Sequence, residues 1–137
     1  MSRTHRTLLC AGVMILALIA GCGHTSGVPL ANVSGRATFY GRPVPIEIIF
    51  QPETDDRQLA GRPSVAVTDA DGYYTLGFTQ EEQGAVIGRQ RVTLKVLPFA
   101  DGGEPATMTE AVTPLKTTRV LREVRPGNNR FDFALTY

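Results

Sequence analysis

The sequence predicts an all-β domain, an antiparallel β-sandwich of six or seven short strands. Apolar and polar residues alternate over short segments, and turns rich in Gly, Pro and Asn separate these segments. After the N-terminal apolar run, no stretch has the period of an amphipathic helix. Many short strands joined by tight turns, with no helices to cover a parallel sheet, are typical of a sandwich.

The N-terminus has the pattern of a bacterial lipoprotein signal peptide over residues 1–21. Arg3 and Arg6 make a basic start, and residues 8–20 form an apolar run of 13 residues, too short to span a bilayer as a helix. The run ends in Leu-Ile-Ala-Gly-Cys22, which resembles the bacterial lipobox. That resemblance implies that Cys22 carries acyl chains such as palmitate and becomes the mature N-terminus. An ordinary secretory signal or an uncleaved helix is the alternative.

The expected location is the cell envelope, on a membrane through the N-terminal lipid and facing the periplasm or the exterior. Gly23 after Cys22 favours the outer membrane in a cell with two membranes. Cys10 lies in the signal and Cys22 carries lipid, so no disulfide is expected and the core alone has to hold the fold.

The predicted organisation is a signal peptide (1–21), a flexible tether (22–31) and one sandwich domain (32–137). Gly, Ser, Thr and Pro29 dominate the tether. Removing the signal lowers the Lys+Arg count from 14 to 12, against 13 Asp+Glu. This nearly neutral balance gives no support to nucleic-acid binding.

The first two strands are predicted at residues 33–39 and 46–50, where alternation is regular. Gly41-Arg-Pro43 turns the chain between them, and the polar, proline-bracketed residues 52–63 form a loop. The residues expected to face the core are Val33, Gly35, Ala37, Phe39, Ile46, Ile48 and Phe50.

The third and fourth strands, 64–68 and 73–78, are expected to form a β-hairpin around Asp69-Ala-Asp-Gly72. The acidic side chains bond nearby backbone amides there, and Gly accepts a positive φ without steric cost. The alternating residues expected on the core face are Val65, Val67, Tyr74, Leu76 and Phe78.

The second half of the chain contains the most regular strand, predicted at 89–97 with Val92, Leu94 and Val96 inward. Before it, residues 79–88 can hold at most a helical turn. An irregular region is expected at 99–117, with an edge strand near 107–112. A strand follows at 120–124, with Arg122 on its apolar face, and then a turn at 126–129. The closing strand is predicted at 130–136, with Phe131, Phe133 and Leu135 inward.

The order of these segments resembles the transthyretin-like, carboxypeptidase-regulatory-like domain, as found in short bacterial lipoproteins. The matching pieces are Val33-Ser-Gly-Arg-Ala-Thr with Gly41-Arg-Pro-Val-Pro, Ile48-Ile-Phe-Gln-Pro52, Thr68 to Leu76, Gly84 to Leu94, and Glu123 to Phe131 with the closing strand. The resemblance implies a seven-stranded, prealbumin-like sandwich. It implies no peptidase activity, because the domain is an accessory of the carboxypeptidases that contain it.

Catalytic and metal chemistry find little support in the mature sequence. Its single histidine, His24, lies in the tether, where a catalytic base cannot be held in position. Asp69 and Asp71 begin like a calcium loop, but strand residues follow at once and favour a plain β-turn. The carboxylates of 55–56 and 81–82 are expected to be solvated rather than a glycosidase pair. No cofactor is expected.

Aromatic residues supply the remaining candidate site. Tyr40, Tyr73, Tyr74 and Phe99 are the candidates for a sugar platform, and Tyr74 is assigned to the core because it shares the face of Leu76. Tyr73 and Phe99 are therefore the candidate ligand contacts. We expect a non-enzymatic, lipid-anchored envelope protein with a structural or protein-interaction role. A carbohydrate-binding surface module is the alternative.

Overall fold

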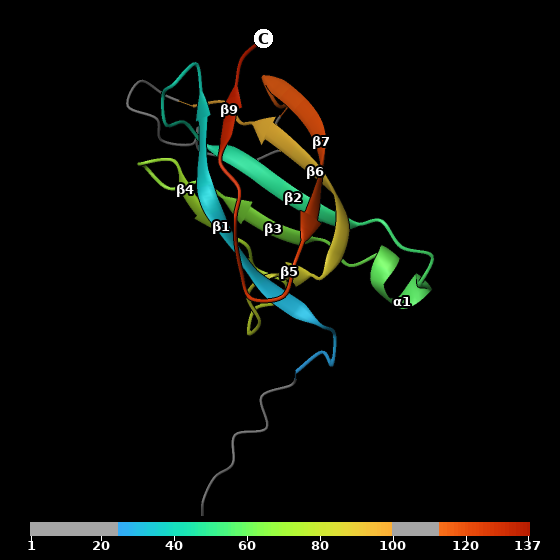
Figure 1. Ribbon diagram of the computed structural model, residues 1–137. Helices are drawn as coiled ribbons and strands as arrows, with labels where there is room; N and C mark the ends of the chain where they lie inside the picture. The colour runs from blue at the N-terminus through green and yellow to red at the C-terminus, as the bar shows by residue number, and fades with distance from the viewer. Residues whose placement is uncertain (1–24, 100–112) are drawn as a thin grey trace, which may run out of the picture.

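The computed structural model describes residues 25–99 and 113–137, which form two β-sheets packed face to face (Figure 1). In chain order the elements are β1 (Leu30–Phe39), β2 (Ile46–Pro52), α1 (Arg57–Ala60), β3 (Ser64–Val67), β4 (Tyr73–Thr75), β5 (Ala85–Val86), β6 (Gly88–Val96), β7 (Lys116–Val124), β8 (Asn128–Arg130) and β9 (Phe133–Leu135). In one sheet β1 pairs with β4, β5, β8 and β9, and the other has the order β3-β2-β6-β7. The predicted all-β class is confirmed.

Strand β1 is the centre of the five-stranded sheet, and it pairs in both directions. It is antiparallel to β4 and β5 but parallel to β8 and β9. The prediction of a wholly antiparallel sandwich is therefore wrong for the closing segment. After β7 the chain leaves the four-stranded sheet through a turn at Gly127 (φ 94°) and then runs beside β1 in the same direction. Parallel strands need a long connection, and here the chain between β1 and β8 supplies it by passing through the other sheet.

The closing segment is two strands rather than the single strand predicted at 130–136, and the interruption falls at Asp132. One Asp132 carboxylate oxygen accepts a hydrogen bond from the backbone N–H of Arg36 at 2.8 Å. Beside this contact, a Cβ on Gly35 would lie 1.9 Å from the carbonyl oxygen of Phe131. Gly35 thus permits a close approach of the two backbones that any side chain would prevent.

Strands β3 and β4 belong to different sheets, so the predicted hairpin is only partly formed. The Asp69 N–H bonds the Tyr73 carbonyl at 2.8 Å, and Val65 and Gly77 exchange two backbone hydrogen bonds of 2.9 and 3.0 Å. Between these points the strands separate, and β3 pairs with β2 while β4 pairs with β1. The Asp69–Gly72 turn therefore connects the two sheets.

The predicted core face of β3 is also wrong. Val65 and Val67 are 38% and 49% exposed, whereas Ser64 and Thr68 are buried. The Thr68 hydroxyl accepts from the Ile46 N–H at 2.9 Å and donates to the Val44 carbonyl at 2.8 Å. These two bonds satisfy backbone groups where β2 begins, and they fix which face of β3 turns inward.

Several element bounds differ from the prediction. Asp56 caps the one-turn helix α1 inside the expected loop 52–63, since its carboxylate accepts from the Gln58 N–H at 2.8 Å. Strand β5 lies within 79–88, β7 begins at Lys116, and β1 begins inside the segment expected to be a tether. The possible strand near 107–112 lies outside the described residues. Within the described residues, no helix is long and apolar enough to cross a membrane.

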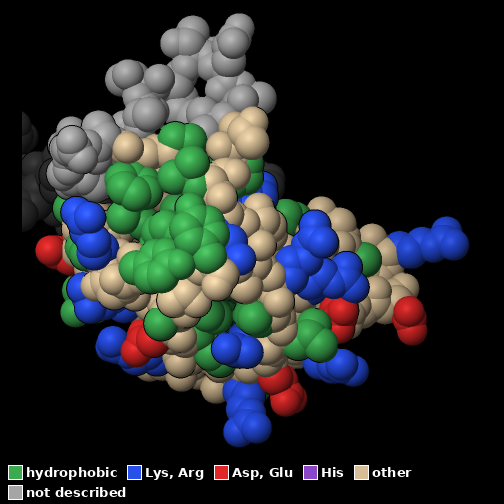
Figure 2. Space-filling view, turned by 90° about the horizontal axis from the view of Figure 1, so that it is seen from above, with side chains coloured by type: hydrophobic (Ala, Val, Ile, Leu, Met, Phe, Trp, Pro, Cys, Tyr) green, Lys and Arg blue, Asp and Glu red, His purple; other side chains and the backbone are tan. Residues whose placement is uncertain are grey.

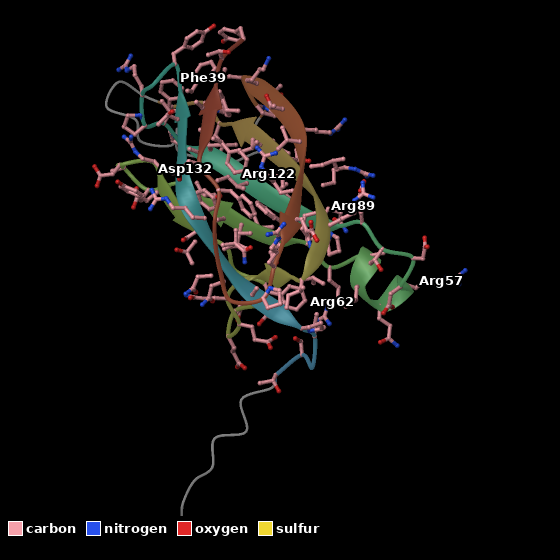
Figure 3. All side chains as sticks on the ribbon, in the orientation of Figure 1. Phe39, Arg57, Arg62, Arg89, Arg122 and Asp132 are labelled. Atoms are coloured by element: carbon pink, nitrogen blue, oxygen red, sulfur yellow. The ribbon has the colours of Figure 1, made fainter. Side chains whose placement is uncertain are left out.

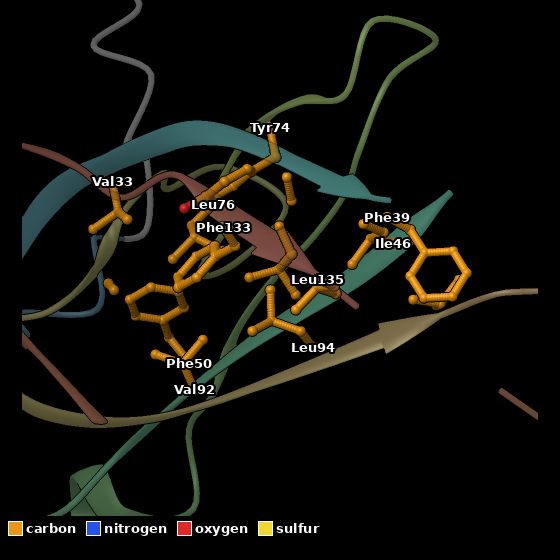
Figure 4. Packing of buried hydrophobic residues seen from close by; sticks show 14 of the residues in the cluster. Val33, Phe39, Ile46, Phe50, Tyr74, Leu76, Val92, Leu94, Phe133 and Leu135 are labelled. Atoms are coloured by element: carbon orange, nitrogen blue, oxygen red, sulfur yellow. The ribbon is translucent and has the colours of Figure 1, made fainter. Parts of the chain in front are cut away.

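The core between the sheets contains most of the predicted inward residues (Figure 4). The fully buried members of β1, β2 and β6 are Val33, Ala37, Ile46, Ile48, Phe50, Val92, Leu94 and Val96. Tyr74, Leu76, Phe133 and Leu135 are also buried, as predicted, while Phe131 and Phe78 are half-buried. The Tyr74 hydroxyl donates to the Phe131 carbonyl at 2.6 Å. Burial, reinforced by the Asp132 carboxylate, raises the pKa of Tyr74 far above its usual range.

Candidate functional site

The aromatic residues proposed as ligand contacts lie on different parts of the molecule. Tyr73 lies on β4 with 49% of its surface exposed, at the outer face of the five-stranded sheet. Phe99 is half-buried and packs against the core. Tyr40 follows β1 at one end of the sandwich. Tyr73 and Phe99 therefore do not form one platform.

Tyr73 borders a surface depression of about 400 Å³, called here the Tyr73 depression. It is lined by Arg36 and Thr38 of β1, Tyr73 of β4, Arg130 of β8 and residues 132–134. The Arg36 guanidinium carbon lies 5.7 Å from the centre of the Tyr73 ring, and the Nε of Arg36 donates to the Asp71 carbonyl at 2.9 Å. The guanidinium is thus held by an aromatic ring and a backbone carbonyl.

Asp132 is the one carboxylate among the residues that line this depression (Figure 3). The Arg36 backbone N–H is the main cause that lowers the pKa of Asp132, and Arg130 adds to it by a hydrogen bond and by its charge. The Arg130 Nε lies 3.3 Å from the second Asp132 oxygen. The depression therefore combines two guanidinium groups, one ionised carboxylate and one half-exposed tyrosine ring.

A second surface surrounds the turn between β1 and β2. Phe39 and Arg42 exchange two backbone hydrogen bonds of 2.9 and 3.0 Å, which close a two-residue turn formed by Tyr40 (φ 51°) and Gly41 (φ 76°). Positive φ at both central residues is the type I′ pattern, which favours Asn, Asp or Gly. Among the described residues Tyr40 is the single non-glycine residue with positive φ. A bulky aromatic residue there is strained.

The strained Tyr40 belongs to a group of rings at this end, and we call Phe39, Tyr40, Tyr137 and Lys116 the tyrosine patch. The ring centres of Tyr40 and Tyr137 are 5.7 Å apart, and each lies about 5 Å from that of Phe39, at 4.9 and 5.3 Å. The Lys116 ammonium lies 5.8 Å from the centre of the Tyr137 ring. Tyr40 and Tyr137 are 54% and 75% exposed, and Figure 2 shows hydrophobic side chains gathered on this face.

Sequence reasoning did not find Tyr137 as a site residue, because nothing in its local pattern connects it to Tyr40. The contact arises because β9 runs parallel to β1, so that the residues following both strands meet at the same end. A Tyr40 N–H bond to the Leu135 carbonyl at 2.8 Å and a Tyr137 N–H bond to the Tyr40 hydroxyl at 3.1 Å hold them together. The sequence contains one signal for this site, which is the position of Tyr40 directly before Gly41 in a predicted turn.

The acidic candidates have structural partners. One Asp69 oxygen accepts from the backbone N–H groups of Asp71 and Tyr73, each at 2.9 Å, so this side chain forms the turn. Asp55 and the pair Glu81–Glu82 line two different depressions. Among the described residues no group of three His, Cys, Asp or Glu is placed to hold a metal ion.

Cys22 and His24 lie outside the described residues, but the chain just after them contacts the domain. A single Glu82 oxygen accepts from both the backbone N–H and the hydroxyl of Ser26, at 3.0 and 3.1 Å. The expected tether is therefore attached to the 79–82 turn from Ser26 onward. Searches against protein-family models, curated proteins and solved structures find no match for this chain.

Proposed function

We propose that this chain is a non-enzymatic, lipid-anchored protein of the bacterial cell envelope that binds another envelope protein through the tyrosine patch. The observation that carries the proposal is Tyr40, an exposed aromatic residue kept at a left-handed position where Asn or Gly would be unstrained. Exposed tyrosines are typical anchors of protein interfaces, because they bury a large rigid area at low entropic cost.

The position of the patch relative to the tether supports this role. Strand β1 begins next to the segment attached at Ser26 and ends at the patch, and its ten residues span about 30 Å. Figure 1 shows the C-terminus at the end of the molecule opposite to the beginning of β1. If Cys22 is lipidated, Ser26 lies at most about 14 Å from it along the chain. The patch then faces away from the membrane.

We also propose that the domain is transthyretin-like, in an outer-membrane lipoprotein with a signal peptide over residues 1–21. The two packed sheets and the number of longer strands are compatible with the resemblance. If β8 and β9 are counted as one interrupted strand and the two-residue β5 is set aside, seven strands remain in the described residues. Seven is the number that the resemblance implies.

The protein-binding role can be tested by photo-crosslinking in cells. A photoreactive phenylalanine analogue at position 137 should crosslink to an envelope protein, whereas the same analogue at Val67, which is 49% exposed on β3, should not. The crosslink at 137 should disappear in a Tyr40→Asn background. Equal crosslinking from both positions, or a product that persists in the Tyr40→Asn protein, would reject the patch as the binding surface.

A further inference from the structure

The Tyr73 depression is a separate surface with its own chemistry. It lies on the outer face of the five-stranded sheet, and none of its lining residues belongs to the tyrosine patch. Arg36 reaches it from the centre of the sheet, Tyr73 from one neighbouring strand and Arg130 from the other. The depression is open to solvent and has a volume of about 400 Å³.

Both arginines in this depression are held by protein groups at Nε. The Nε of Arg36 bonds the Asp71 carbonyl at 2.9 Å, and the Nε of Arg130 lies 3.3 Å from Asp132. Within residues 25–99 and 113–137, no hydrogen bond involves the terminal nitrogens of either guanidinium. Each arginine is thus bonded at Nε, and among the described residues its terminal N–H groups have no partner and can bind a ligand.

Both oxygens of the Asp132 carboxylate already have partners in the protein. The Arg36 backbone N–H donates to one Asp132 oxygen at 2.8 Å, and Arg130 occupies the other. Two guanidinium groups line the depression with this single carboxylate, whose oxygens already have partners. Guanidinium groups bind carboxylates through paired N–H bonds.

We propose that the Tyr73 depression binds an acidic saccharide, with the sugar carboxylate on the terminal nitrogens of Arg36 and Arg130 and the sugar ring against Tyr73. Arg36 lies over the Tyr73 ring, and the part of this residue that stays exposed, 49%, supplies the flat apolar contact that a pyranose ring uses. Asp132 retains lone pairs that accept from hydroxyl groups. A carboxylate alone would not need the aromatic contact. This site does not depend on the proposed protein partner.

The test is calorimetric titration of the purified full-length protein in neutral detergent with trigalacturonate, and with maltotriose as the uncharged control. We expect trigalacturonate to bind and maltotriose to bind at least tenfold more weakly. Arg130→Gln and Tyr73→Ala should each weaken trigalacturonate binding at least tenfold. Arg119→Gln, which removes the same charge from the exposed face of β7, should leave it unchanged, as should Tyr137→Ala on the tyrosine patch.

Arg36→Gln is a second charge variant, and circular dichroism with a urea midpoint establishes that each protein is folded. The proposal is overturned if trigalacturonate does not bind, or if Arg119→Gln weakens binding as much as Arg130→Gln. Equal affinity for maltotriose would overturn the carboxylate assignment. Equal affinity for a triglutamate peptide, unaffected by Tyr73→Ala, would overturn the saccharide assignment.

Discussion

At the scale of single residues, Tyr40 shows how local strain and surface chemistry are balanced. A side chain in the left-handed region costs roughly 1–2 kcal/mol. The rings of Phe39 and Tyr137, 4.9 and 5.7 Å from that of Tyr40, offset part of this cost, since an aromatic pair contributes about 0.5–1.5 kcal/mol.

Tyr40→Asn should therefore change the free energy of unfolding by less than about 1 kcal/mol, because relief of strain offsets the lost ring contacts. Urea denaturation measures this difference. A loss of several kcal/mol would show that Tyr40 is needed for folding, and a crosslink lost in this variant would then be explained by unfolding.

Gly35→Ala should lower the free energy of unfolding by about 1–3 kcal/mol or more, because the new Cβ would collide with the Phe131 carbonyl at 1.9 Å. Gly61→Ala is the control, since nothing lies within 4 Å of its Cβ position and its φ is −94°. If both variants unfold at the wild-type urea midpoint, β1 and the 131–132 segment do not approach as described.

Asp132 predicts a pH dependence of stability. Its pKa is lower in the folded state than in the unfolded chain, where it is about 3.9. The carboxylate therefore adds stability that is complete above the unfolded pKa and is lost as pH falls through the folded pKa.

The urea midpoint of the wild type should exceed that of Asp132→Asn at about pH 6, and the difference should shrink toward about pH 3. Asp55→Asn, in an exposed loop, is the control for a general charge effect. A difference that stays constant between these pH values would contradict the role of the ionised carboxylate.

At the scale of elements, alternation in the sequence predicted β1, β2 and β6 with their inward residues, because each has a regular apolar face in the core. It failed for β3, where the valines point outward. Thr68 is inside because two backbone groups near β2 need its hydroxyl. Such a requirement depends on a distant strand, so a local pattern cannot reveal it.

Strand β7 lies at the edge of its sheet, and among the described residues it pairs with β6 alone. Arg122 on its inner face lies with its guanidinium carbon 5.4 Å from the centre of the Phe133 ring. An inward charge on an edge strand discourages pairing with a second molecule.

Arg122→Val should therefore increase self-association, which light scattering after size-exclusion chromatography measures. Arg119→Val places the same residue on the exposed face of β7 and should remain closer to the wild-type mass. If Arg122→Val stays monomeric at concentrations where Arg119→Val associates, exposed apolar area rather than the inward charge decides association.

At the scale of the whole molecule, the proposed anchor is the most direct prediction from the sequence. Radioactive palmitate should label the wild type and the Cys10→Ala protein but not Cys22→Ala, because the cysteine that follows Ala-Gly is the acylated one in a lipobox. Globomycin should cause the uncleaved precursor to accumulate. Label that remains on Cys22→Ala would contradict lipidation at this position.

The candidate sites were less predictable than the fold. Tyr73 could be selected from the sequence because Tyr74 shares the core face of Leu76, and the residue next to it in a strand must then point outward. Its partners Arg130 and Asp132 lie some 60 residues away, and they reach Tyr73 only because β8 and β9 run parallel to β1. The same parallel pairing brings Tyr137 to Tyr40. Sequence periodicity carries no information on the direction in which a distant strand pairs.

The parallel pairing of β1 with β8 and β9 also has a kinetic consequence. Asn32 bonds Asn128, and the Arg36 N–H bonds Asp132, across 96 residues of chain in each case. The first strand to emerge from a ribosome or an export channel therefore cannot complete its sheet until the last strands have followed. Contacts at such separation form slowly. If the proposed signal peptide directs export, the five-stranded sheet stays incomplete while the chain is threaded through the export channel.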